Sequence, residues 1–282
     1  MQKRLLILFL LLAFSLSISQ SVVADKFLIE KVDVKISNIN PDGSVRVHES
    51  IKFAMFGDYS ISLYDSVVSK SELSLWSNVT GLSDVKFHVN PSKVAIREFR
   101  LRPQPRTRCN PIQGICHGEL ILDYLALPSF TNNSSSPISG TGIFSTYEIK
   151  PRTMRYVLNP NSLSFTSTSD GNLILSDNVF LTIAFPDSAE LVDLNPAPVD
   201  SNIEVPSKID ELTWNDMALV RFSLVFDVED SIDREIVNFF SRFFENVLRF
   251  STGANGPASI VLILILFGSY LYIQNSKRRG DD

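Results

Sequence analysis

The chain has 282 residues, of which 44% are hydrophobic and 20% charged, and its formal net charge is -5. This length allows one large domain or two ordinary ones. Net negative charge argues against nucleic-acid binding as the main function, because neutralising phosphates requires clustered Lys and Arg. Two of the most apolar stretches lie at the ends of the chain, and this uneven distribution indicates a membrane-anchored protein of the secretory route.

The N-terminal segment 1–24 has the features of a cleavable signal peptide. Lys3 and Arg4 precede the apolar run 5–14, and a polar stretch leads to the small-residue ending Val22-Val23-Ala24. We predict cleavage after Ala24. A retained N-terminal anchor is the alternative, but its apolar core is shorter than the ~20 residues that a spanning helix needs.

Residues 25–128 are predicted to form an extracytoplasmic β domain. Apolar residues alternate with polar ones on both sides of Asp42-Gly43, which is a typical hairpin turn sequence. In the second of these strands Glu49 falls on the same face as Val47 and Ile51, so it is expected to point inward. An inward carboxylate needs a hydrogen-bonding or charged partner. Glu49 is therefore either a residue that stabilises the fold or a ligand-binding residue.

His48 and His88 alternate with apolar neighbours, and we expect both on the solvated face of a strand. No histidine lies in a motif that assigns it a catalytic or metal-binding role. No cofactor and no metal site are predicted.

An arginine-rich segment approaches the first cysteine and is the main candidate ligand-binding site. Its members are Arg97, Arg100, Arg102, Arg106 and Arg108. Guanidinium groups suit phosphate, sulfate or carboxylate, so an anionic lipid headgroup, a glycan or an acidic partner are the candidate ligands. The alternative is a solvated strand end whose arginines pair with Asp and Glu of the chain.

Cys109 and Cys116 flank a turn-forming segment that contains Pro and Gly. An extracytoplasmic pair at this spacing predicts a disulfide that closes a small loop. A metal site that includes the adjacent His117 is the alternative, but it lacks a second pair of ligands. Three asparagines match the acceptor pattern for N-glycosylation, namely Asn78, Asn132 and Asn133.

Segment 129–142, rich in Ser, Asn, Pro and Gly, is predicted to link the first domain to a second β domain at 143–230. A long surface loop within one domain is the alternative. In the second region, Asp170-Gly171 predicts another hairpin, and alternation over 220–228 predicts a half-buried strand. The expected fold is mainly β, with one or two antiparallel β-sandwich domains.

The C-terminal part has an amphipathic pattern followed by a membrane span. Residues 231–252 repeat apolar side chains at helical spacing, which predicts a juxtamembrane helix that packs on the outer region, lies among headgroups or docks on a partner. Residues 257–273 carry no charge and are predicted to form a transmembrane helix, with a buried core helix as the alternative. The basic residues in 274–282 place this tail in the cytoplasm, so the N-terminus after cleavage lies outside.

The segment Val45-Arg-Val-His-Glu49 after Asp42-Gly43 resembles the opening of a family of uncharacterised prokaryotic membrane proteins. Leu212-Thr-Trp-Asn and the strand after it are similar to the closing segment of that family's outer domain. The resemblance implies a signal peptide, a β-rich outer domain and C-terminal membrane anchoring, and it transfers no active site. This chain departs from many members because it lacks a second long hydrophobic segment and an extended cytoplasmic region.

These features favour a single-pass, membrane-anchored binding module whose β domains bind a protein or a glycan. The lipid bilayer is an expected partner, and nucleic acid is not. An accessory subunit of a membrane-embedded complex, docked through the Phe-rich segment 231–252, is the second hypothesis. An extracytoplasmic enzyme is the third, since the chain contains no recognisable catalytic motif.

Overall fold

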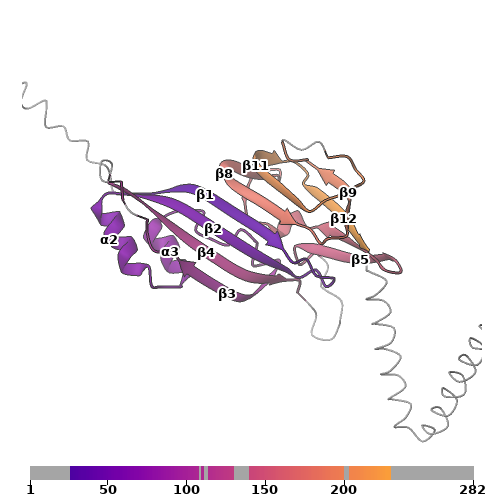
Figure 1. Cartoon of the computed structure of the whole chain (residues 1–282), viewed down its shortest axis with the longest axis horizontal. Coiled ribbons are helices and arrows are strands. Elements are labelled where there is room, and N and C mark those ends of the chain that lie inside the picture. Colours follow the sequence, from indigo (N-terminus) through magenta and orange to yellow (C-terminus); the bar gives the residue numbers. More distant parts are fainter. Residues whose placement is uncertain (1–25, 108, 111–113, 130–139, 200–202, 230–282) are drawn as a thin grey trace, which may run out of the picture. The chain divides into compact units, whose positions relative to one another are not determined.

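The structure is a computed structural model that describes residues 26–107, 109–110, 114–129, 140–199 and 203–229 (Figure 1). The predicted signal peptide, juxtamembrane helix, transmembrane helix and cytoplasmic tail lie outside these residues, as do Arg108, Asn132 and Asn133. Within the described ranges, no helix is long and apolar enough to span a bilayer.

The described strands form two sheets, which confirms the prediction of a mainly β protein. The larger sheet has the order β11-β8-β1-β2-β4-β3, and the short β7 also pairs with β8. Its strands are β1 (Lys26–Ser37), β2 (Val45–Phe56), β3 (Ala95–Pro103), β4 (Ile115–Leu127), β7 (Thr166–Ser167), β8 (Leu173–Ala184) and β11 (Glu211–Leu219). The smaller sheet has the order β10-β9-β12-β6-β5. Its strands are β5 (Phe144–Lys150), β6 (Thr153–Leu158), β9 (Ala189–Asn195), β10 (Ser207–Lys208) and β12 (Ser223–Glu229), and a 3-10 turn, η1 (Pro160–Ser162), follows β6.

Strands β1 and β2 form the hairpin that the Asp42-Gly43 sequence predicts, and they pair antiparallel from Lys26–Phe56 to Ser37–Arg46. Gly43 adopts a φ of 80°, which favours glycine at this turn. Alternate residues of β2 are fully buried, and Glu49 is among them. The alternation therefore placed this strand and its inward face correctly.

The expectation of purely antiparallel pairing is wrong at one position. Strands β1 and β8 are parallel, with Val32 opposite Val179 and Ile36 opposite Ile183. Parallel neighbours require a long crossover, and here the chain between them contributes to both sheets. Alternation within a strand reports which face is buried and not which way the neighbouring strand runs.

Strands from both sides of segment 129–142 share the larger sheet, because β1 from the first predicted domain pairs with β8 from the second. Residues up to Ile149 and Met154–Val228 also belong to one compact unit. Strands from both sides of this segment thus lie in one sheet, and most of the segment itself is outside the described residues.

Two helices were not predicted, α2 (Asp58–Val67) and α3 (Leu73–Thr80). Figure 1 shows both at the end of the larger sheet where β1 begins. They bury Tyr64 and Trp76, whose rings contact each other edge to face at 5.2 Å, and Tyr64 contacts Phe53 of β2. Each helix buries only two residues, so neither carries a long apolar stripe that sequence periodicity would detect.

Candidate functional site

Three of the candidate arginines lie along β3, the edge strand of the larger sheet. The register between β3 and β4 shifts between Arg97 and Arg100, which is a β-bulge. Within it Glu98 adopts a φ of 52°. Phe99 within the bulge and Leu101 after it pack against the core, and Arg97 and Arg100 point outward and are exposed. The bulge thus places Arg97 and Arg100 on the same face of the sheet, opposite Leu125 and Asp123 of β4.

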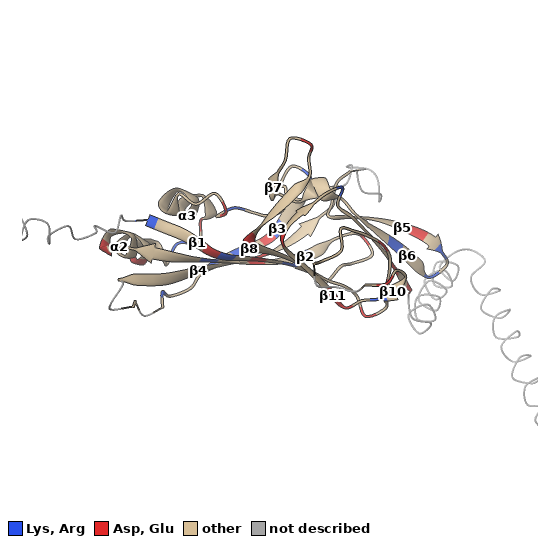
Figure 2. Cartoon of the chain, turned by 90° about the horizontal axis from the view of Figure 1, so that it is seen from above, with Lys and Arg blue, Asp and Glu red and all other residues tan. Residues whose placement is uncertain are grey.

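The neighbouring strands bring acidic and basic residues beside these arginines. On β2, Arg46 forms an ion pair with Glu98 at 3.3 Å, and His48 Nδ1 lies 2.7 Å from Asp123 Oδ1. Arg102 bonds the second oxygen of Asp123. Figure 2 shows Lys, Arg, Asp and Glu in adjacent bands along the strands of this sheet.

Asp123 is held as an anion by these contacts. Its burial acts to raise the pKa, but hydrogen bonds from His48 and Arg102 and their charges outweigh that effect, so the pKa of Asp123 lies below its usual value. Both of its carboxylate oxygens are therefore engaged.

Arg100 lies directly opposite Asp123 in the β3–β4 register, yet it does not bond this carboxylate. Among the described residues, Arg97 and Arg100 form no ion pair, whereas Arg46 and Arg102 do. We call the outward side of β2, β4 and β3 that carries Arg46, Arg97, Arg100 and Arg102 the arginine face. Its arginines outnumber the two carboxylates that they contact, Glu98 and Asp123.

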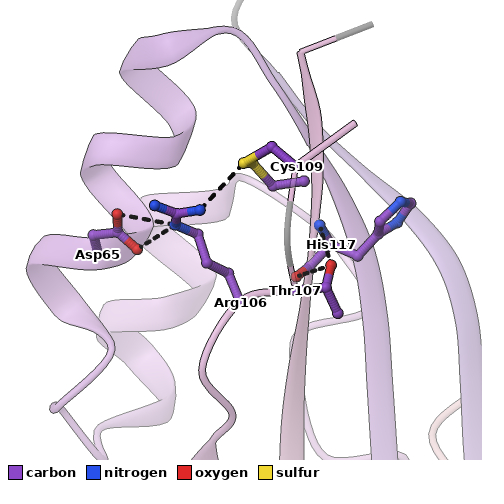
Figure 3. Close-up of a disulfide and its surroundings, with 6 residues drawn as sticks. Asp65, Arg106, Thr107, Cys109 and His117 are labelled. Carbon is purple, nitrogen blue, oxygen red and sulfur yellow. Dashed lines mark hydrogen bonds and ion pairs between the residues drawn. A yellow bond between two sulfur atoms is a disulfide. The ribbon is translucent and has the colours of Figure 1, made fainter. Parts of the chain in front are cut away.

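Arg106 lies apart from the arginine face, beside α2 and the disulfide. Its Nε donates to both carboxylate oxygens of Asp65, at 2.9 and 3.0 Å, and its Nη1 lies 3.2 Å from Cys109 Sγ. Figure 3 shows its guanidinium between these two partners. A pocket of about 340 Å³ opens here, lined by Asp65, Val68, Pro105, Arg106 and Thr107. The structure thus separates Arg106 from the arginines of β3, which the sequence had grouped together.

Cys109 and Cys116 form the predicted disulfide. His117 does not turn toward the sulfurs, because its Nδ1 lies 2.9 Å from a carboxylate oxygen of Glu30. The backbone N–H of His117 donates to the Thr107 hydroxyl at 3.3 Å. The alternative of a metal site at these residues is therefore wrong, since disulfide-bonded sulfur is not a thiolate ligand.

Glu49 forms the centre of a buried polar cluster. One of its carboxylate oxygens accepts hydrogen bonds from the backbone N–H of His88 at 3.0 Å and from the hydroxyl of Tyr124, and the other lies 2.8 Å from His88 Nδ1. Burial is the main reason that the pKa of Tyr124 lies well above its usual value, and the negative charge of Glu49 adds to it. Tyr124 thus stays protonated, and its hydroxyl donates a hydrogen bond to Glu49.

The expectation that His88 lies on a solvated face is wrong, because the side chain is only 1% exposed. His88 belongs to no regular strand, and its carbonyl accepts a hydrogen bond from the backbone N–H of Ser164 at 2.8 Å. Glu49 and His88 therefore join β2 to the connection after α3 and to residues near η1. His48 is half exposed, as expected. The contacts of Glu49 favour the structural role over ligand binding, since the residue is fully buried.

Of the three predicted glycosylation acceptors, only Asn78 is described, and its side chain is exposed on α3. No three His, Cys, Asp or Glu residues gather in a metal-binding arrangement within the described ranges.

No protein-family model and no curated protein matches the chain. Among solved structures it is similar to native leukotriene A4 hydrolase from Saccharomyces cerevisiae, with 9% identity, a TM-score of 0.30 and coverage of 74% of this chain and 30% of that one. A second structure of the native yeast enzyme gives 9% identity, a TM-score of 0.31 and coverage of 72% and 29%. The complex of the yeast enzyme with bestatin gives 10% identity, a TM-score of 0.30, and coverage of 76% of this chain and 32% of that one. The chain spans about a third of the length of these proteins, and a likeness this low carries no argument about function.

Proposed function

We propose that the protein is a single-pass, membrane-anchored binding module whose extracytoplasmic β region contacts an anionic partner through the arginine face. The observation that carries the proposal is the exposed guanidinium of Arg100, which lacks a carboxylate partner within the described residues although Asp123 lies opposite it. The alternative, a solvated strand end whose arginines pair with Asp and Glu, holds for Arg46 and Arg102 but not for Arg97 and Arg100 among the described residues. Unpaired guanidinium groups suit a carboxylate, sulfate or phosphate of a ligand.

The proposed location rests on the ends of the chain and on its cysteine chemistry. The apolar run 257–273 followed by Lys277, Arg278 and Arg279 supports a single span with a cytoplasmic tail. The Cys109–Cys116 disulfide fits an oxidising compartment outside the cytoplasm. The resemblance to prokaryotic membrane proteins with outer β domains is consistent with the same arrangement.

Binding is favoured over catalysis because the candidate acid of the enzyme hypothesis is inaccessible. Glu49 is 0% exposed, and both oxygens are occupied by His88 and Tyr124. A general acid or base must reach the proton of a substrate, directly or through one water. Glu49 in this environment stabilises the fold.

Two measurements on the full-length chain test the proposal. Carbonate washing of membranes and protease added outside intact cells test the anchor, and we expect the chain to stay in the membrane with its C-terminus protected. Binding of immobilised anionic ligands by the detergent-solubilised protein tests the arginine face, and we expect Arg97→Gln with Arg100→Gln to weaken it. Release of the chain by carbonate contradicts the anchor, and an unchanged affinity contradicts the binding role.

An accessory subunit of a membrane complex is the second candidate. Tyr147 and Ile149 are 56% and 39% exposed on β5, an edge strand of the smaller sheet, and exposed apolar side chains of this size favour a partner surface. Replacing Phe240, Phe243 and Phe244 with Ser should then release a stoichiometric partner that otherwise copurifies in mild detergent. A chain that purifies without such a partner contradicts this second function.

A further inference from the structure

Apolar side chains of β4 lie between Arg46 of β2 and the three arginines of β3. On β4 the inward residues, among them Leu122 and Tyr124, are fully buried, whereas Ile121, Leu125 and Leu127 point outward and are half-buried. Leu125 and Leu127 are successive outward residues of this middle strand, and Asp123 lies between them and Ile121.

The strand register places arginines on both sides of Leu125 and on one side of Ile121. Leu125 is paired with Arg46 of β2 and with Arg97 of β3, and Ile121 is paired with Arg102 of β3. Neighbouring strands lie about 4.8 Å apart, so Arg46 and Arg97 are within roughly 10 Å of each other across Leu125. The face therefore presents leucine and isoleucine side chains beside guanidinium groups, with the carboxylate of Asp123 among them.

We propose that the arginine face binds an acidic segment of a partner protein. In this complex, apolar side chains of the partner lie on Ile121, Leu125 and Leu127, and its carboxylates pair with Arg97 and Arg100. This inference rests on the proposed function and adds the chemical class of the partner.

The composition of the face favours a protein over an acidic glycan or a lipid headgroup. Four of its cations are arginines, with Lys52 of β2 near Glu119 on the same side, and arginine is enriched in protein interfaces whereas lysine is depleted. A glycan or a headgroup would use the guanidinium groups but would gain little from the branched aliphatic side chains beside them. A protein segment uses both, because apolar burial supplies affinity and charge pairs supply orientation.

The β-bulge indicates how the partner docks. A bulged edge strand is poorly suited to pairing with an added strand, since Glu98 interrupts the regular ladder of β3. The partner is therefore expected to bind through side chains on the sheet face and not by extending the sheet.

The test uses the full-length protein in detergent and three labelled probes. They are a synthetic peptide that mixes glutamate and leucine, a glutamate-only peptide of the same net charge, and a sulfated oligosaccharide. Affinities are compared for the parent chain, for Arg97→Gln with Arg100→Gln, and for Leu125→Gln. The matched control is Lys31→Gln with Lys35→Gln, which removes the same charge from cations on the outward side of β1 that pair with Asp33 and Glu211.

We expect the glutamate–leucine peptide to bind most tightly. The double arginine variant should weaken it by roughly ten-fold, and the lysine control should change it little, since its cations are already paired. Leu125→Gln should weaken the mixed peptide and leave the glutamate-only peptide unchanged.

Two results overturn the inference in different ways. If the oligosaccharide binds most tightly, or if Leu125→Gln has no effect, the partner class is wrong while an anion-binding role still stands. If no probe binds, or if the arginine variant cannot be distinguished from the lysine control with any probe, both the partner class and the proposed function are wrong.

Discussion

Arg100 and Asp123 lie opposite each other on adjacent strands, yet they do not form an ion pair. The two oxygens of Asp123 are taken by His48 from β2 and by Arg102, which lies two residues farther along β3. Each oxygen of this carboxylate thus accepts from a side chain other than Arg100. The positive charge that remains at Arg100 belongs to the face from which the binding function is inferred.

Removing the carboxylate of Asp123 should therefore strengthen binding of acidic ligands. We expect Asp123→Asn to raise the affinity for an acidic peptide several-fold at low salt and to lower the free energy of unfolding by about 1 kcal/mol or less, because the ion pairs are partly exposed. Peptide affinity as a function of salt concentration measures the first effect. Asp33→Asn is the matched control, since Asp33 pairs with Lys31 on the same side of the sheet.

The contribution of Asp123 to the free energy of unfolding depends on pH. The pKa of Asp123 is lower in the folded protein than in an unfolded chain, so its contribution is present above about pH 4 and is lost as the pH falls through the folded-state pKa. The difference in unfolding free energy between the parent and Asp123→Asn should disappear over this acidic range. A difference that grows below pH 4 would contradict the assignment.

The buried cluster around Glu49 makes a separate prediction about stability. Glu49→Gln replaces a carboxylate that accepts from His88 and Tyr124 with an amide that offers one acceptor oxygen. Breaking a buried charged contact costs about 3–5 kcal/mol, so we expect a loss of about 3 kcal/mol. Tryptophan fluorescence in urea measures it, because Trp76 and Trp214 are both fully buried.

The exposed Glu190 on β9 provides the control for this substitution. Glu190→Gln should change the free energy of unfolding by less than about 0.5 kcal/mol. Equal effects of the two substitutions would contradict a structural role for Glu49. We also expect the Glu49→Gln protein that remains folded to bind the acidic ligand with unchanged affinity, because Glu49 is buried and is not part of the arginine face.

The disulfide should contribute moderately to stability because it closes a short loop. Cys109 and Cys116 are seven residues apart, and the chain-entropy relation for a loop of this length gives about 2–3 kcal/mol. We expect the double substitution with Ser to lower the free energy of unfolding by about this amount. Reducing agent should destabilise the parent chain and leave the Ser variant unaffected. A parent chain whose stability does not change on reduction would contradict the prediction.

The sequence predicted those features that depend on neighbours along the chain. The β1–β2 hairpin, the inward position of Glu49 and the Cys109–Cys116 disulfide all follow from alternation, turn residues or short spacing. The exposed positions of Arg97 and Arg100 were also consistent with a solvated strand. Each of these properties is encoded within a few residues.

Features that depend on distant residues were missed. Glu49 contacts His88 and Tyr124, which are 39 and 75 residues away, and local alternation therefore placed His88 on the wrong side. Gly118 shows the same limit, because a Cβ there would lie 2.7 Å from the Tyr64 ring of the unpredicted helix α2. The unpaired state of Arg100 likewise depends on the β3 bulge and on His48 from another strand. Only the three-dimensional register reveals these relationships.

Tyr64 gives a prediction for alkaline conditions. Burial raises the pKa of Tyr64 to about 12, with further contributions from the negative charges of Asp65 and Glu119, and its hydroxyl donates to the carbonyl of Gln104. The neutral phenol is therefore favoured in the folded state, so its stabilising effect is complete below about pH 10 and is lost as the pH rises toward 12.

The Tyr64→Phe variant has no hydroxyl at this position and cannot ionise there. We expect this variant to be less stable than the parent by about 1 kcal/mol at neutral pH, because the hydrogen bond is lost, and the difference to narrow between pH 10 and 12. Urea titrations at several pH values measure the narrowing, with Tyr59→Phe as the control because Tyr59 is 66% exposed on the same helix. A difference that stays constant up to pH 12, or that narrows equally for the control, would show that ionisation of Tyr64 does not limit alkaline stability.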